Sequence, residues 1–218
     1  MGLNPLAVHF DNGWNSELAV DNISKCIRAL GFDLYTHVID WEEFKDLQMA
    51  YRKASVIDIE AITDHAIRAI MYKVAAKHKV KYIINGNNIV TEAILPKSWI
   101  FNKSDAENIK SIHKSFGHVP LKSFPLMDKW KKQYYFKVLK IKNISILNYV
   151  PYVKKEIQKI LTKELGWRDY GGKHYESVFT RFYQGYILPN KFKIDKRRAH
   201  LSTLICSGQL IREVAIAE

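Results

Sequence analysis

Three short apolar runs, separated by segments with helical spacing, constrain the fold of this chain most strongly. The runs cover Leu6–Phe10, Phe32–Ile39 and Val80–Ile84, and each has the length and apolar character of a buried strand. Strands that alternate with helices favour an α/β fold, in which a parallel sheet carries helices on its faces. Ligands of such sheets bind where the carboxyl ends of the strands meet.

Local signals place helices between these strands. Asn15 or Ser16 is positioned to cap the first helix, and Gly31 to end it. Trp41–Lys53 has helical spacing, and a capping box that begins at Ser55 predicts the start of a third helix.

The alternation stops after Pro96, and the remainder of the chain is predicted to be mainly helical. Helical stretches are expected at 104–116, 128–140 and 153–165. Residues 143–149 fit a short strand or a loop. We therefore divide the chain into an α/β part, 1–97, and a mainly helical part, 98–218, packed together as one unit.

Charge narrows the range of partners. Lys and Arg number 34 against 22 Asp and Glu, a formal net charge of +12, which favours a nucleotide, nucleotide sugar, nucleic acid or membrane surface. The two cysteines, Cys26 and Cys206, support neither a disulfide framework nor a Cys-rich metal site, so a reducing cytoplasm fits best. The sequence has no signal-peptide pattern and no run of 18 apolar residues, so membrane insertion is not expected.

A basic and aromatic stretch near the end of the chain is the strongest candidate for a binding surface. Residues 166–200 contain eight Lys or Arg and three acids, with aromatic residues interleaved. Cations between rings suit a ligand that has phosphates and a ring or sugar face. Tyr170–Lys173 adds a glycine turn whose N–H groups can approach an anion. The alternative is a solvated basic loop.

Two polar motifs follow predicted strands. Asp11-Asn12-Gly13 comes after the first strand, and Asn85-Gly86-Asn87-Asn88 comes after the third. A carboxylate at such a strand end can meet an adenine amino group, a ribose hydroxyl or Mg²⁺. Taken alone, both motifs are better explained as ordinary turns.

These segments together resemble the N-acetyl sugar amidotransferase family of PP-loop ATP pyrophosphatases. The resemblance rests on GWRDYGGKHYES, FTRFYQGYILP and IDKRRAHLS, and upstream on HFDNGWNSE, ITDH and NGNNIVTE. It covers nearly all of the chain and implies an adenine nucleotide alpha hydrolase-like fold. The phosphate-gripping Ser-Gly-Gly-x-Asp-Ser loop of that family does not occur in this sequence.

The resemblance implies a reaction in the biosynthesis of lipopolysaccharide or flagellin sugars. ATP, with Mg²⁺, would activate the amide of an N-acetyl group on a nucleotide-linked sugar, and ammonia would convert it to an acetamidino group. Ammonia would come from a separate glutaminase through a channel subunit, because no glutaminase Cys-His pair is evident here. A cytoplasmic protein without a specific nucleic-acid partner is expected.

The residue types and the resemblance together predict the site residues. The expected catalytic residues are Lys173, Arg181 and Arg197, which would hold phosphates together with Lys196. The expected nucleotide-binding residues are Asp11, Asn12, Gly13, Gly86, Asn87, Asn88 and Lys191. The expected substrate-binding residues are Asp64, Thr91, Glu92, His174, Glu176 and Arg198. Two candidates, His174 and Glu176, do not make a metal site, and no protein metal ligand is assigned.

Two alternatives remain open. A PP-loop enzyme that modifies tRNA would also be basic, and a non-catalytic remnant could still bind sugar nucleotide or partner subunits. The first strand begins within five residues of Met1, and a helical pattern opens at Gln209 and stops at Glu218. We therefore expect an incomplete copy of a longer enzyme, with ATP turnover near background.

Overall fold

The computed structural model describes residues 2–217, which form two compact units that are interleaved along the sequence. The first unit contains the stretch up to Trp14 together with Asp33–Ile83 and Ile100–Asn143. The second contains Asn15–Phe32, Ile84–Trp99 and the chain from Ile144 onward. The division near residue 97 into an N-terminal and a C-terminal part stays a prediction.

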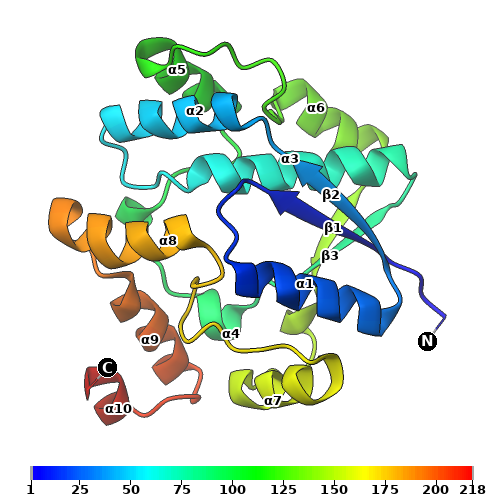
Figure 1. Cartoon of the computed structure of the whole chain (residues 1–218), viewed down its shortest axis with the longest axis vertical. Coiled ribbons are helices and arrows are strands. Elements are labelled where there is room, and N and C mark those ends of the chain that lie inside the picture. Colours follow the sequence, from blue (N-terminus) through cyan, green and yellow to red (C-terminus); the bar gives the residue numbers. More distant parts are fainter. Residues whose placement is uncertain (1, 218) are drawn as a thin grey trace. The chain divides into compact units, whose positions relative to one another are not determined.

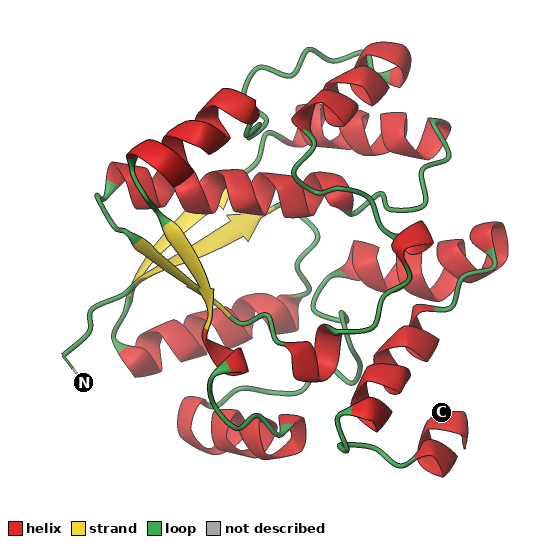
Figure 2. Cartoon of the chain, turned by 180° about the vertical axis from the view of Figure 1, so that it is seen from behind, coloured by secondary structure: helices red, strands yellow, loops and turns green. Residues whose placement is uncertain are grey.

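Helices predominate in both units (Figures 1 and 2). The first unit holds β1 (Leu6–Asp11), β2 (Asp33–Val38), α2 (Trp41–Lys53), α3 (Ala61–Lys77), α5 (Ala106–Phe116), α6 (Lys129–Gln133) and the π-helix η2 (Tyr134–Val138). The second holds α1 (Glu17–Leu30), α4 (Ile89–Glu92), η1 (Lys97–Trp99), η3 (Ile146–Asn148), α7 (Lys154–Leu165), α8 (Val178–Phe182), the π-helix η4 (Tyr183–Phe192), α9 (Lys196–Cys206) and α10 (Arg212–Ala217). Strands β3 (Tyr82–Asn85) and β4 (Lys142–Ser145) run from the first unit into the second.

The strands confirm an α/β architecture but are divided between two small sheets. β1 and β2 pair in parallel, with Leu6 opposite Asp33 and Asp11 opposite Val38, as the alternation predicts. β3 pairs with β4 instead of joining them, so the expected single sheet is not formed within residues 2–217. The reason is that β4 supplies the backbone hydrogen-bond partners of β3. In the sequence, the segment that forms β4 fitted either a short strand or a loop.

Most helix boundaries follow the local signals. The Ser16 side chain caps α1 by accepting from the N–H of Ala19, and Gly31 ends that helix in the left-handed conformation at φ 64°. α2 has the predicted bounds. The third helix begins at Ala61 and not just after Ser55, because the Asp58 carboxylate accepts from the N–H of Phe101 instead of capping a helix. In the described part of the chain, no helix has the length and apolar character that crossing a membrane requires.

The first unit encloses a core in which the buried Glu43 and His65 side chains are bonded to backbone groups. Phe44, Leu47 and Ile62 are completely buried between the helices. The Glu43 carboxylate accepts from the N–H groups of Lys122, Ser123 and Phe124 and so fixes that loop. The His65 ring donates from Nδ1 to the carbonyl of Lys103 and accepts at Nε2 from the N–H of Met127.

The second unit packs around the π-helical segment η4. Burial of Tyr183 and Leu188 anchors this segment, and Pro189 lies within it. A π-helix has one extra residue per turn, which re-aims the side chains that follow, and such segments often occur at functional sites. On α9, the buried Thr203 hydroxyl accepts from the N–H of Ile94 and donates to the carbonyl of Ala199. α4 and α9 are thereby held together beside η4.

Candidate functional site

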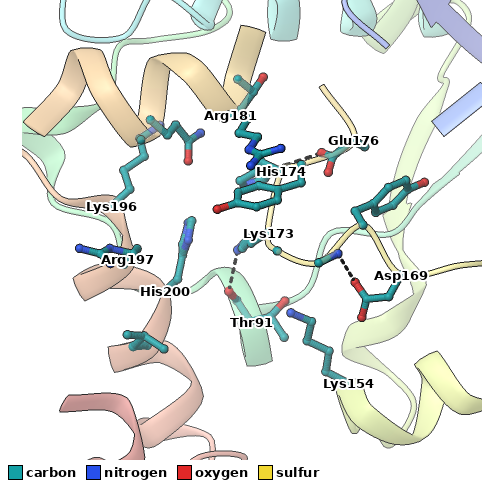
Figure 3. Close-up of a pocket in the computed structure, with 18 of the residues that line it drawn as sticks. Thr91, Lys154, Asp169, Lys173, His174, Glu176, Arg181, Lys196, Arg197 and His200 are labelled. Carbon is teal, nitrogen blue, oxygen red and sulfur yellow. Dashed lines mark hydrogen bonds and ion pairs between the residues drawn. The ribbon is translucent and has the colours of Figure 1, made fainter. Parts of the chain in front are cut away.

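The second unit contains a pocket of about 980 Å³, within the size range of small-molecule sites. Its walls come from α4, α7, the loop 167–176, the α8–η4 helix and α9 (Figure 3). Most of the lining side chains are polar or charged, and cations outnumber acids.

The loop that forms one wall is anchored to α1 at both ends. The Asn22 side chain accepts from the N–H of Arg168 at 2.9 Å and donates to its carbonyl at 2.8 Å. At the other end, the N–H of Ser16 donates to the carbonyl of Glu176 at 2.8 Å. The Arg168 side chain also pairs with Asp21 at 2.7 Å. The backbone that carries Lys173 is therefore held in place before any ligand binds.

The glycine turn within this loop is ordered by its neighbours. Gly171 has a φ of +79° and donates its N–H to Asp169 Oδ1 at 2.9 Å. At Gly172, a Cβ atom would lie 2.9 Å from the ring of Tyr175, so a larger residue there would have to displace that ring. The Gly171 N–H is thus satisfied within the loop. In this loop, Lys173 is the group placed to meet an anion.

Lys173 points into the pocket from this turn. Its Nζ donates to the carbonyl of Thr91 at 3.2 Å, the one hydrogen bond it makes to the described residues (Figure 3). Asn88 fixes that carbonyl by capping α4: its Oδ1 accepts from the Thr91 N–H at 2.9 Å and the Thr91 hydroxyl at 3.0 Å. Partial burial lowers the pKa of Lys173, and the charge of Glu92 opposes this shift, while the charges of Lys154 and Lys196 add to it. A lysine so placed favours an incoming anion.

Two histidines lie at the centre of the same cation cluster. The rings of His174 and His200 are 5.6 Å apart. Burial, followed by the charge of Lys173, lowers the pKa of His200 to about 3, so its ring is neutral at pH 7. Burial acts to raise the pKa of Glu176, but the hydrogen bond from His174 at 3.3 Å, a backbone hydrogen bond and the charge of Lys173 together outweigh it, so the net shift is downward.

Two arginines that line the pocket each contact a neighbouring side chain of the protein. The Arg181 guanidinium lies over the ring of Tyr175, 4.4 Å from its centroid, and forms a flat cationic surface of the kind on which a ring or sugar can pack. Arg197 pairs with Asp195 at 2.7 Å, and this pairing lowers the pKa of Asp195. Much of the Arg197 charge is thus compensated within the protein.

The pocket brings together part of the predicted site. Seven of the predicted residues line it: Thr91, Lys173, His174, Glu176, Arg181, Lys196 and Arg197. Asn88 caps α4 and Glu92 ends it, so both flank Thr91. The second unit also holds Gly86, Asn87, Lys191 and Arg198, which are not among the lining residues.

The remaining predicted residues belong to the first unit. Asp11 and Asn12 accept from the N–H groups of Gly13 and Trp14, which is ordinary turn geometry. Asp64 pairs with Lys103. Their participation in one site with Lys173 stays a prediction.

Sequence reasoning missed several lining residues that come from regular helices. Lys154 and Gln158 project from α7, and His200 and Leu204 project from α9 on the same face as the expected Lys196. Each set follows a spacing of four residues, which places its members on one face of a helix. That spacing is readable in the sequence, but which face turns toward a ligand is decided by packing.

The donor set fits a phosphate-bearing ligand better than a metal ion. The acids of the pocket already have partners: Asp169 accepts from Gly171 and Gln158, Glu176 pairs with His174, and Asp195 pairs with Arg197. Among the described residues, no group of three or more His, Cys, Asp or Glu is placed to hold a metal. These residues do not fit a protein-held Mg²⁺ site, and we derive no step through one.

Comparison with known proteins gives one family. Residues 176–218 match the model of the C-terminal domain of WbpG-like LPS biosynthesis proteins. The matched segment carries Arg181, Arg197 and His200 of the pocket. The match makes residues 176–218 similar to that domain and points to LPS biosynthesis in general. No curated protein matches the chain.

Proposed function

We propose that the pocket binds a nucleotide-linked N-acetyl sugar, and that this chain acts in an N-acetyl sugar amidotransferase reaction of LPS biosynthesis. The observation that carries the proposal is the half-buried Lys173, which is bonded to one carbonyl and has Lys154 and Lys196 near it in the same pocket. Phosphate oxygens would complete its hydrogen bonds and neutralise the cluster.

The shape of the pocket suits the two chemically different ends of such a ligand. A sugar diphosphate would place its phosphates between Lys173, Lys154 and Lys196. Its ring would lie on the surface formed by Arg181 and Tyr175, which are 4.4 Å apart. The neutral His200 ring can either donate or accept a hydrogen bond, as sugar hydroxyls and an acetamido group require.

The residues of this pocket would bind and orient the acceptor in the proposed reaction. ATP, when bound, supplies an adenylyl group to the amide oxygen with release of pyrophosphate, and ammonia then replaces AMP at that carbon to leave an acetamidine. Lys173 and Arg181 would fix the diphosphate so that the acetamido group takes one position. Ammonia would be delivered by a separate glutaminase and channel subunit.

Isothermal titration calorimetry tests the proposal at roughly 0.15 M salt, where non-specific attraction to phosphates is weakened. A UDP-linked N-acetyl sugar should bind more tightly than single-stranded RNA of equal charge. It should also bind more tightly than the free N-acetyl sugar, which lacks the diphosphate. Tighter binding of RNA would favour the tRNA-modifying alternative and overturn the proposal.

A further inference from the structure

A second basic surface lies on the first unit, in the helical segment formed by α6 and η2 (Figure 1). Its inner side is anchored, because Tyr135 and Leu139 pack against a core cluster that includes Tyr72 and Met127. The ring of Tyr135 stacks on that of Tyr72 at 5.9 Å. The segment is thus a fixed part of the unit, with one face turned to the core and the other to solvent.

The outer side carries large apolar residues that the unit does not cover. Trp130 is 81% exposed, Tyr134 50% and Val138 66%. They are spaced four residues apart, which aligns them along one side of a helix. Single exposed apolar residues are ordinary, but an aligned ridge that includes the most exposed Trp of the described chain indicates a contact surface.

Charge identifies the partner. Residues 128–142 contain six lysines, no arginine and a single acid, Asp128. Asp128 is occupied in capping α6, where it accepts from the N–H of Lys131. The ridge is flanked by lysines, and Lys129, Lys131, Lys137, Lys140 and Lys142 are exposed. Lysines beside Trp, Tyr and an aliphatic residue are typical of helices that lie in the interface of an anionic membrane.

We propose that the ridge Trp130–Tyr134–Val138, with its flanking lysines, docks the protein on an anionic phospholipid surface. The rings and Val138 would enter the headgroup boundary, while the lysines pair with lipid phosphates. A nucleic-acid partner fits less well, because arginine, the preferred residue for phosphate forks and base stacking, is missing from 128–142. This proposal does not depend on what the pocket binds.

Co-sedimentation with vesicles tests it at roughly 0.15 M salt. The whole chain should bind vesicles of phosphatidylcholine with about one third phosphatidylglycerol, and bind pure phosphatidylcholine about tenfold or more weakly. The double variant Lys129→Gln/Lys137→Gln should lower the partition coefficient about tenfold. The matched variant Lys155→Gln/Lys159→Gln removes the same charge from exposed positions of α7 and should change it by less than about threefold.

The ridge itself is tested by Trp130→Ser/Tyr134→Ser, which keeps every lysine and should lower vesicle binding about tenfold. Circular dichroism and thermal denaturation confirm that each variant is folded. Three results would overturn the proposal: wild-type protein that stays in the supernatant, equal losses in both lysine pairs, or tighter binding of single-stranded RNA than of vesicles with the same sensitivity to Trp130→Ser/Tyr134→Ser.

Discussion

Two buried polar groups of the first unit and one lysine of the second differ in how completely they are bonded. In the first, Glu43 and His65 are almost wholly buried, and each is bonded to backbone groups of a distant loop. In the second, Lys173 is half-buried with one carbonyl partner and lies among other cations. A fully bonded polar group holds a fold together, whereas a cation with an incomplete set of partners lowers stability until a ligand completes it. We therefore assign a structural role to Glu43 and His65 and a binding role to Lys173.

The comparison predicts its largest effect for Glu43→Gln. The change removes a carboxylate that accepts from three backbone N–H groups and turns an amide N–H₂ toward them. We expect the free energy of unfolding to fall by about 3 kcal/mol, since buried donors lose a charged acceptor. Urea denaturation measures this loss, and UDP-sugar affinity of the folded fraction should not change. A loss of unfolding free energy below about 0.5 kcal/mol would contradict the structural role assigned to Glu43.

The opposite pattern is expected for Lys173→Met. This variant keeps the length of the side chain and removes the charge, so the affinity for a UDP-linked N-acetyl sugar should fall about 30-fold, or about 2 kcal/mol. Unfolding free energy should stay equal or rise, because a poorly partnered charge is removed. Lys163→Met, at an exposed position of α7 outside the pocket, is the matched control and should leave both quantities unchanged. Strong destabilisation by Lys173→Met with unchanged affinity would show that Lys173 has a structural role and not a binding role.

Acid should loosen the first unit through His65. Burial lowers the pKa of His65 from its ordinary 6.5, so the folded state holds the neutral ring. The contribution is fully present above pH 6.5 and is lost as the pH falls below it, because the unfolded state then binds the proton more readily. His65 should contribute a slope of up to about 1.4 kcal/mol per pH unit to denaturation as the pH falls below 6.5.

The variant that tests the role of His65 in this pH dependence is His65→Gln, whose side-chain amide can also donate and accept a hydrogen bond. It should be less sensitive to pH over the same range. A wild-type slope that persists unchanged in His65→Gln would assign the effect to another group.

The smallest expected effect concerns Arg197. Asp195 neutralises this side chain and caps α9 through the N–H of Arg197 at 3.0 Å. Asp195→Asn keeps a capping side chain but removes the counter-charge, so UDP-sugar affinity should rise about threefold. Calorimetry at low salt measures the gain. Weaker binding would mean that Asp195 itself contacts the ligand.

Local patterns were enough to predict most of the helices and the first parallel strand pair. Ser16 and Gly31 bound α1 as expected, because capping depends on a few neighbouring residues. The pairing of β3 was not predictable in this way, since its partner β4 is almost 60 residues away. The start of α3 was misread for the same reason, because the Asp58 carboxylate bonds to Phe101 and not to its own helix.

Some of the residues that line the pocket could be predicted from the sequence, and others could not. The composition of the stretch 166–200 indicated Lys173 and Arg181, because clustered cations and rings show in the sequence itself. His200 and Lys154 were missed, since their role arises from helices that packing turns toward Lys173. Arg197 was identified, but its neutralisation by Asp195 depends on side-chain geometry that the sequence does not contain.

A crystal structure of the protein with a UDP-linked N-acetyl sugar tests the central claim most directly. The account predicts the diphosphate in the pocket of the second unit, with a phosphate oxygen within about 3 Å of Lys173 Nζ. It also predicts a ring of the ligand packed on the Arg181 and Tyr175 surface. Electron density for the ligand elsewhere on the protein, with Lys173 still bonded only to the carbonyl of Thr91, would contradict the account.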